Sequence, residues 1–92
     1  MMIRSKKEIT EFLNRFHDFA ILDDGGEKYY FCFDEKATGN IVTLMKYKDN
    51  SFTINRRNEE WHDNGEFSIT REDLGKLIWE NHREINKNIQ DV

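Results

Sequence analysis

Residues 28–34, Lys-Tyr-Tyr-Phe-Cys-Phe-Asp, constrain the fold of this chain more than any other stretch. Aromatic residues favour strands, and successive side chains of a strand point to opposite faces of its sheet. Tyr29, Phe31 and Phe33 therefore share one face, and Tyr30 and Cys32 share the other. Because both faces of this strand are apolar, the sequence predicts a sheet with a core face and a second face that also needs a cover.

Residues 41–47 repeat this two-sided apolar pattern, and the turn that follows predicts how the strands align. A two-residue Asp49-Asn50 turn places Tyr47 opposite Phe52 in a hairpin. On this register the core face carries eight large side chains: Tyr29, Phe31, Phe33, Ile41, Met45, Tyr47, Phe52 and Ile54. The second face then carries Tyr30, Cys32, Val42 and Leu44, joined by Ile21.

Two further turns are predicted from glycine positions. The adjacent glycines of residues 24–27, Asp-Gly-Gly-Glu, accept the positive φ angles of a hairpin turn that follows a short strand at residues 19–22. A three-residue loop at residues 63–65, with Gly65 in the left-handed conformation, pairs Trp61 with Phe67.

One helix is predicted before the strands in the sequence, and one after them. Ser5 and Glu8 form a capping box at the start of the first helix, which is expected to run to about Asp18. Thr70 caps the second helix, with Asp73 at the third helical position. Its buried stripe is Leu74, Leu77, Ile78, Ile85 and Ile89. The expected fold is a single α+β domain over residues 1–92: an N-terminal helix, an antiparallel β-meander of about four to six short strands, and a C-terminal helix packed on the sheet.

Composition restricts the class of protein. The chain has 92 residues, net charge −4 and one cysteine, which excludes an intrachain disulfide framework. No run approaches the roughly 18 consecutive apolar residues of a membrane span, and the N-terminus leads into no secretory segment. We therefore expect a cytoplasmic protein with no membrane partner.

The residue types used in catalysis are present but form no motif. His17, His62 and His82 are too scattered for metal-ligand spacing, so we expect no metal and no cofactor. Cys32 lies within a strand between two phenylalanines, where a cysteine is usually an inert apolar residue. The sequence therefore favours a protein that is not an enzyme.

Basic residues suggest an alternative function. Lys46, Lys48, Arg56 and Arg57 form the best basic cluster, and aromatic residues beside Lys and Arg on an open sheet are typical of single-stranded nucleic-acid binding. The acidic total charge makes nucleic acid the less favoured partner.

The second apolar face carries the leading functional hypothesis. Tyr30, Cys32, Val42 and Leu44 are expected to form a patch that docks another protein or a second copy of the chain. The competing interpretation is a three-layer domain in which one helix covers each face.

The composition also suggests a setting. Nine Asn, nine Ile and no Pro in so short a chain are typical of accessory proteins of AT-rich bacteria and their phages. From this association we expect a phage- or mobile-element-type regulator or inhibitor that blocks a host protein sterically.

Overall fold

The strands form one antiparallel sheet in which order in space follows order in the chain. A computed structural model describes residues 1–58, 60 and 63–89. The sheet order is β1-β2-β3-β4-β5, a meander. Its strands are β1 (Ile21–Leu22), β2 (Lys28–Asp34), β3 (Ile41–Tyr47), β4 (Phe52–Arg57) and β5 (Asp63–Ser68). With helices before and after the sheet, the predicted α+β class is confirmed.

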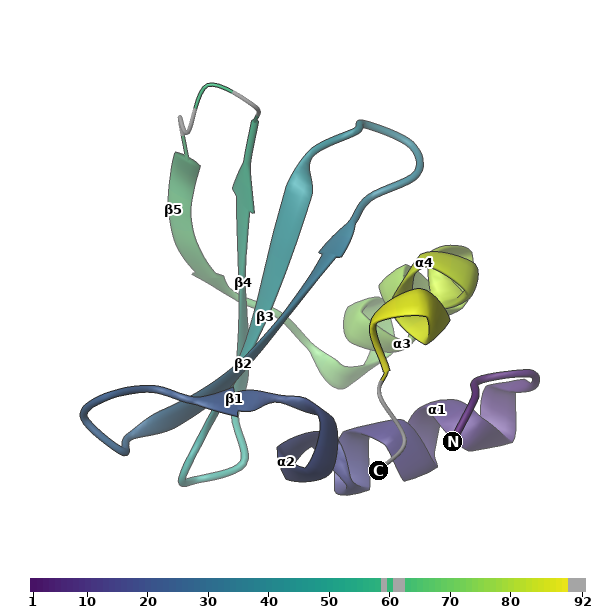
Figure 1. The fold of residues 1–92 in the computed structure, drawn as a ribbon, viewed down its shortest axis with the longest axis horizontal. Helices are drawn as coiled ribbons and strands as arrows, with labels where there is room; N and C mark the ends of the chain where they lie inside the picture. The colour runs from purple at the N-terminus through teal and green to yellow at the C-terminus, as the bar shows by residue number, and fades with distance from the viewer. Residues whose placement is uncertain (59, 61–62, 90–92) are drawn as a thin grey trace.

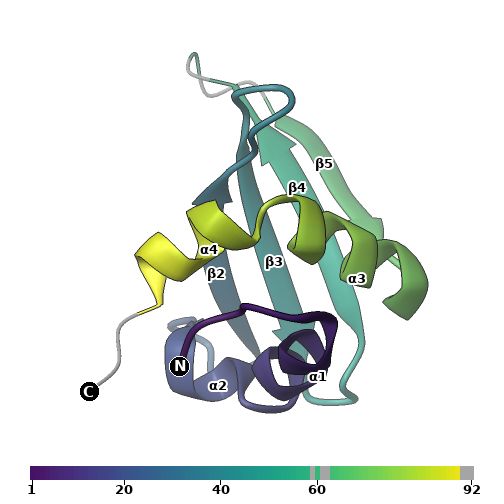
Figure 2. The same ribbon diagram turned by 90° about the vertical axis from the view of Figure 1, so that its right-hand side faces the viewer.

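The helices all lie on one face of the sheet (Figures 1 and 2). They are α1 (Lys6–Asn14), α2 (Phe16–Phe19), α3 (Arg71–Glu80) and α4 (His82–Asn88). In Figure 2, α3 and α4 cross in front of the strands, and α1 and α2 lie near one end of them. Within the described residues no helix covers the other face, so the competing interpretation, a three-layer domain with one helix on each face, is wrong.

The helix starts follow the sequence only in part. Thr70 caps α3 as predicted, because its hydroxyl accepts a hydrogen bond from the Asp73 backbone N–H at 3.1 Å. Ser5 precedes α1, but its side chain makes no hydrogen bond to the helix backbone. Glu8 instead accepts hydrogen bonds from the Arg4 backbone N–H and the Ser5 hydroxyl, at 3.0 and 3.2 Å. The expected capping box is therefore replaced by a contact in which Glu8 binds the backbone N–H of Arg4, one residue before the cap, and the Ser5 hydroxyl.

Each predicted helix is divided into two. The first breaks at Arg15, and the second breaks at Asn81, whose side chain is buried. The Asn81 side-chain amide donates to the Leu77 carbonyl at 2.9 Å and accepts from the Lys36 backbone N–H at 2.9 Å. Asn81 thus joins the break between α3 and α4 to the loop between β2 and β3.

The core lies between the sheet and the helix layer, and edge-to-face phenylalanine contacts form its centre. The Phe12 and Phe16 rings lie 5.8 Å apart, and Phe16 lies 5.4 Å from Phe52. The other core residues include Ile3, Ile9, Leu13, Phe31, Phe33, Ile54, Leu74, Leu77, Ile78 and Ile85.

Val42 and Leu44 belong to this core, which corrects their predicted placement on the second face. Both are 0% exposed. Leu44 lies opposite Phe31 on β2 and opposite Ile54 on β4, both of which are core residues. The predicted binding patch therefore loses two of its four residues to the helix-covered face.

The error arises in the hairpin between β3 and β4. The Tyr47 backbone N–H donates to the Ser51 carbonyl at 3.0 Å, so the loop has three residues, with Asn50 at φ 67°. Lys46, and not Tyr47, then lies opposite Phe52. A slip of one residue moves every side chain of a strand to the other face, and this slip exchanges the predicted faces of β3.

The other two hairpins were predicted with mixed success. Leu22 pairs with Tyr29 and Gly26 has φ 69°, which confirms the first turn, although Phe19 ends α2 and is not part of a strand. Gly65 has the expected positive φ of 88°, but it lies inside β5. The predicted loop at residues 63–65 is therefore wrong, because these residues belong to β5. Phe67 lies opposite Ile54, and its predicted partner Trp61 is outside the described residues.

Candidate protein-binding surface

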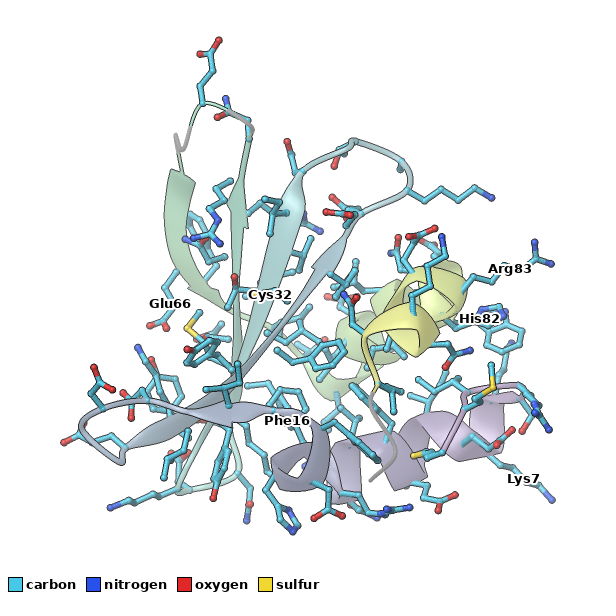
Figure 3. All side chains as sticks on the ribbon, viewed as in Figure 1. Lys7, Phe16, Cys32, Glu66, His82 and Arg83 are labelled. Atoms are coloured by element: carbon cyan, nitrogen blue, oxygen red, sulfur yellow. The ribbon has the colours of Figure 1, made fainter. Side chains whose placement is uncertain are left out.

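The strand register defines the face of the sheet that points away from the helices, here called the open face. Tyr30 on β2, Met45 on β3 and Thr53 on β4 lie side by side across it. By alternation its side chains are Ile21, Lys28, Tyr30, Cys32, Asp34, Ile41, Thr43, Met45, Tyr47, Thr53, Asn55, Arg57, Glu66 and Ser68. Figure 3 shows Cys32 and Glu66 toward this side, with His82 and Arg83 on the far side of the molecule.

An apolar strip crosses the open face from β1 to β3. Ile21 lies opposite Tyr30, and Tyr30 lies opposite Met45. Ile21 is 61% exposed and Tyr30 is half-buried. Cys32 lies beside this strip, with its Sγ 3.3 Å from Thr43 Oγ1. The strip is a continuous apolar surface that no helix of the described chain covers.

Polar side chains from β2, β3 and β5 border the strip. The Tyr47 hydroxyl donates to both carboxylate oxygens of Glu66, at 2.6 and 2.8 Å. Hydrogen bonding to this carboxylate raises the pKa of Tyr47. The Lys28 ammonium lies 5.6 Å from the centre of the Tyr47 ring. Through these contacts Tyr47 on β3 links Lys28 on β2 with Glu66 on β5, and the three side chains form a polar border.

A shallow hollow of about 400 Å³ lies where the strip meets this border. Its lining is Lys28, Thr43, Met45, Asn55, Arg57 and Glu66. Met45 is only 7% exposed although none of the described helices lies above it, so it forms a floor beneath longer neighbours. The hollow therefore combines an apolar base with a rim that carries both charges.

The four predicted protein-binding residues divide between the faces. Tyr30 and Cys32 lie on the open face as expected from β2, while Val42 and Leu44 are buried beneath the helices. The prediction missed Met45, which it assigned to the core face. The asparagine in the turn after β3 was the available signal, because Asn tolerates the left-handed conformation that a three-residue hairpin loop requires.

The four predicted basic residues do not form one patch. Lys46 lies on the helix side, with its ammonium 3.4 Å from the Leu13 carbonyl and 5.8 Å from the Phe52 ring centre. Lys48 is in the loop after β3, and Arg57 is on the open face. Arg56 points to the helix side, where it is bound by Glu35.

Glu35 and Arg56 form a partly buried ion pair. The Arg56 guanidinium donates to both Glu35 carboxylate oxygens, from Nε at 3.0 Å and from Nη2 at 3.1 Å. Thr38 donates a third hydrogen bond to Glu35 at 2.7 Å. Burial raises the pKa of Glu35, but these hydrogen bonds and the Arg56 charge outweigh it and leave the pKa below its ordinary value. A polar run such as residues 34–40 predicts a solvated connection, whereas the Glu35 side chain within it is buried.

The histidines show local contacts. His82 Nδ1 lies 2.7 Å from the Trp79 carbonyl, to which it donates a hydrogen bond, and its ring stacks on the Trp79 ring at 4.4 Å. His17 Nε2 lies 3.2 Å from Asp18. His62 is outside the described residues. Among the residues that the structure describes, no group of three His, Cys, Asp or Glu side chains is arranged to hold a metal ion.

No helix in the described part of the chain is both long and apolar enough to cross a membrane.

Comparison with models of protein families, with curated protein sequences and with solved structures finds no match to this chain.

Proposed function

We propose that this chain is a non-catalytic protein-binding module that docks another protein on the open face of its sheet. The observation that carries the proposal is that all four described helices lie on the opposite face. Ile21 and Tyr30 of the apolar strip consequently have no helix over them within the described chain, and Met45 lies at the floor of the same face.

The make-up of the open face supports protein as the ligand. Tyrosine is enriched at the energetic centres of protein interfaces, because its ring buries apolar area while its hydroxyl keeps a hydrogen bond. Here Tyr30 lies in the strip and Tyr47 lies in the polar border, where Glu66 accepts its hydroxyl hydrogen. An apolar centre with a polar rim is the usual anatomy of a protein-binding surface.

We propose further that the module is a cytoplasmic regulator or inhibitor, of the phage or mobile-element type, that acts by steric blockade of a host protein. Blockade needs only a surface that binds and a body that obstructs. The composition described above, with nine Asn, nine Ile and no Pro, supports this setting.

The test compares two variants that change the charge by the same amount on opposite sides of the molecule. Tyr30→Asp adds one negative charge to the open face, and Arg83→Gln removes one positive charge from α4. Proteins captured from a lysate of the source cells by the tagged wild type are identified, and the purified partner is titrated calorimetrically. We expect Tyr30→Asp to weaken binding at least about tenfold and Arg83→Gln to leave it unchanged. Equal binding by all three proteins would contradict the proposal.

Single-stranded nucleic acid is the second candidate, because Tyr30, Tyr47, Lys28 and Arg57 share the open face. Fluorescence anisotropy with a labelled oligothymidine at low salt tests it. Binding that disappears as salt rises, and that weakens in Tyr30→Ala, would favour nucleic acid over protein.

A further inference from the structure

The two edges of the sheet differ in how they are protected. On the β2 side, β1 pairs with Tyr29 and Tyr30. Beyond β1, the Asn88 side-chain amide on α4 donates to the Cys32 carbonyl at 2.8 Å. On the opposite side, β5 pairs with β4 alone among the described strands and forms the outer edge of the sheet (Figures 1 and 2).

The outward backbone groups of β5 can be assigned from its pairing with β4. The Ile69 backbone N–H donates to the Phe52 carbonyl at 3.4 Å, which fixes the alternation of the ladder. In an antiparallel pair every second residue turns its backbone groups toward the neighbouring strand. Phe67 therefore faces β4, and the N–H and C=O groups of Glu66 and Ser68 point outward.

Residues 66–68 of β5 lack the usual protection of an exposed edge, because the β-bulge of this strand lies before them, between the Glu66–Asn55 and Asp63–Arg57 pairs. Monomeric proteins place Lys, Pro or bulges at such edges, and β5, with the sequence Asp-Asn-Gly-Glu-Phe-Ser, contains neither Lys nor Pro. The register shift lies between Asn55 and Arg57, so the pairing of residues 66–68 is regular. The Tyr47 hydroxyl on β3 donates to the Glu66 carboxylate, so this charge points toward β3 and away from the outer edge.

Phe67 adds apolar surface at the same edge. It lies opposite Ile54 on the helix-covered side of the sheet, yet it is 58% exposed. It borders a groove of about 490 Å³ that also includes Ile54, Ile69 and Leu77. A strand added to β5 would cover the Phe67 ring and satisfy the outward backbone groups together.

We propose that the occupant of this edge is a second copy of the chain, and that two copies join antiparallel through β5 about a two-fold axis at Phe67. Glu66 of the first copy then pairs with Ser68 of the second copy. By symmetry, Ser68 of the first copy pairs with Glu66 of the second copy. These two pairs use the outward N–H and C=O groups and form four backbone hydrogen bonds. Phe67 meets Phe67 of the second copy between them.

Charge and chain geometry select this register over its neighbours. A two-fold axis at Glu66 would place two carboxylates directly opposite each other, which is unfavourable. An axis at Ser68 would place Glu66 opposite Thr70 of the second copy, where the strand has ended and Thr70 already caps α3. The axis at Phe67 opposes each carboxylate with a serine hydroxyl.

The dimer goes beyond the proposed function and does not depend on it. The two-fold axis is perpendicular to the sheet, so both helix layers lie on one side and both open faces lie on the other. A ten-stranded sheet with two adjacent docking surfaces results.

Sedimentation equilibrium of the wild-type protein is the first test. Because a single strand pair buries little area, we expect a weak dimer whose fraction rises between about 10 μM and 1 mM. A protein that stays monomeric throughout this range would overturn the proposal.

Edge variants then locate the contact. Ser68→Pro removes an outward N–H, and Phe67→Lys places a charge at the axis. We expect each to reduce the dimer association constant at least about tenfold. Leu22→Lys, at another exposed apolar residue on β1 that lies outside the open face, is the control and should leave it unchanged. Circular dichroism confirms folding, and a dimer that resists both β5 substitutions would overturn the assignment.

Cross-linking provides a readout that does not rely on lost association. In a Cys32→Ser background, Phe67→Cys should form a covalent dimer on mild oxidation, because directly opposed residues of a non-hydrogen-bonded pair lie about 4.5 Å apart, within disulfide range. Leu22→Cys, on the opposite edge of the sheet, should not. Equal cross-linking at both positions would contradict the β5 interface.

Discussion

Glu35 shows how far the environment of one residue departs from what its sequence neighbours suggest. Residues 34–40, Asp-Glu-Lys-Ala-Thr-Gly-Asn, are polar, and this pattern predicts a solvated loop. The Glu35 side chain is nevertheless buried and bound by Arg56, 21 residues further along the chain. Local sequence cannot reveal this pairing, because it depends on the β3–β4 register that brings Arg56 opposite Val42.

The ion pair predicts a pH dependence of stability. The pKa of Glu35 is lower in the folded protein than its ordinary value of 4.5. The ionised form therefore stabilises the fold above that value, and this contribution is lost as the pH falls through the lower pKa of the folded state. We expect the free energy of unfolding, measured by urea titration, to decrease from pH 5 toward pH 3, and to decrease less in Glu35→Gln. Identical pH dependence in the two proteins would refute the role of Glu35.

At the scale of elements, the hairpin between β3 and β4 decides which side chains are buried. The bounds of β2 and β3 agree with the predicted ranges 28–34 and 41–47. Their alternation alone cannot choose between the faces of β3, since both are apolar. The choice depends on whether the loop has two or three residues, and Asn50 at φ 67° makes it three.

Gly75 in α3 offers a prediction about helix stability. It lies on the groove between α1 and α3, its φ is not positive, and a Cβ added there would meet no atom within 4 Å. Glycine inside a helix costs about 1 kcal/mol relative to alanine. Gly75→Ala should therefore raise the free energy of unfolding by about 0.5–1 kcal/mol, measured by urea denaturation. A decrease would mean that the groove is narrower than described.

At the scale of the whole molecule, fold class was predictable, whereas the sequence left two layer arrangements open. The capping and apolar stripes at both ends and the strand patterns between them are local signals, and they predict an α+β meander. Which face the helices cover depends on long-range packing. Phe12 of α1 and Phe16 of α2 pack on the same sheet face as Leu74 and Ile78 of α3. The loss of Val42 and Leu44 from the binding surface follows from the β3–β4 register, which places them on the covered face.

The described helices cover one sheet face and leave the other face available to a partner. The exposure of three consecutive residues of β3 tests this arrangement most directly. Val42 and Leu44 point into the core, whereas Thr43 lies on the open face. A soluble paramagnetic chelate attenuates NMR signals of exposed groups. In the free protein we predict strong attenuation of the Thr43 methyl and the Tyr30 ring, with the Val42 and Leu44 methyl signals retained. Attenuated Val42 and Leu44 signals beside a protected Thr43 would contradict the account.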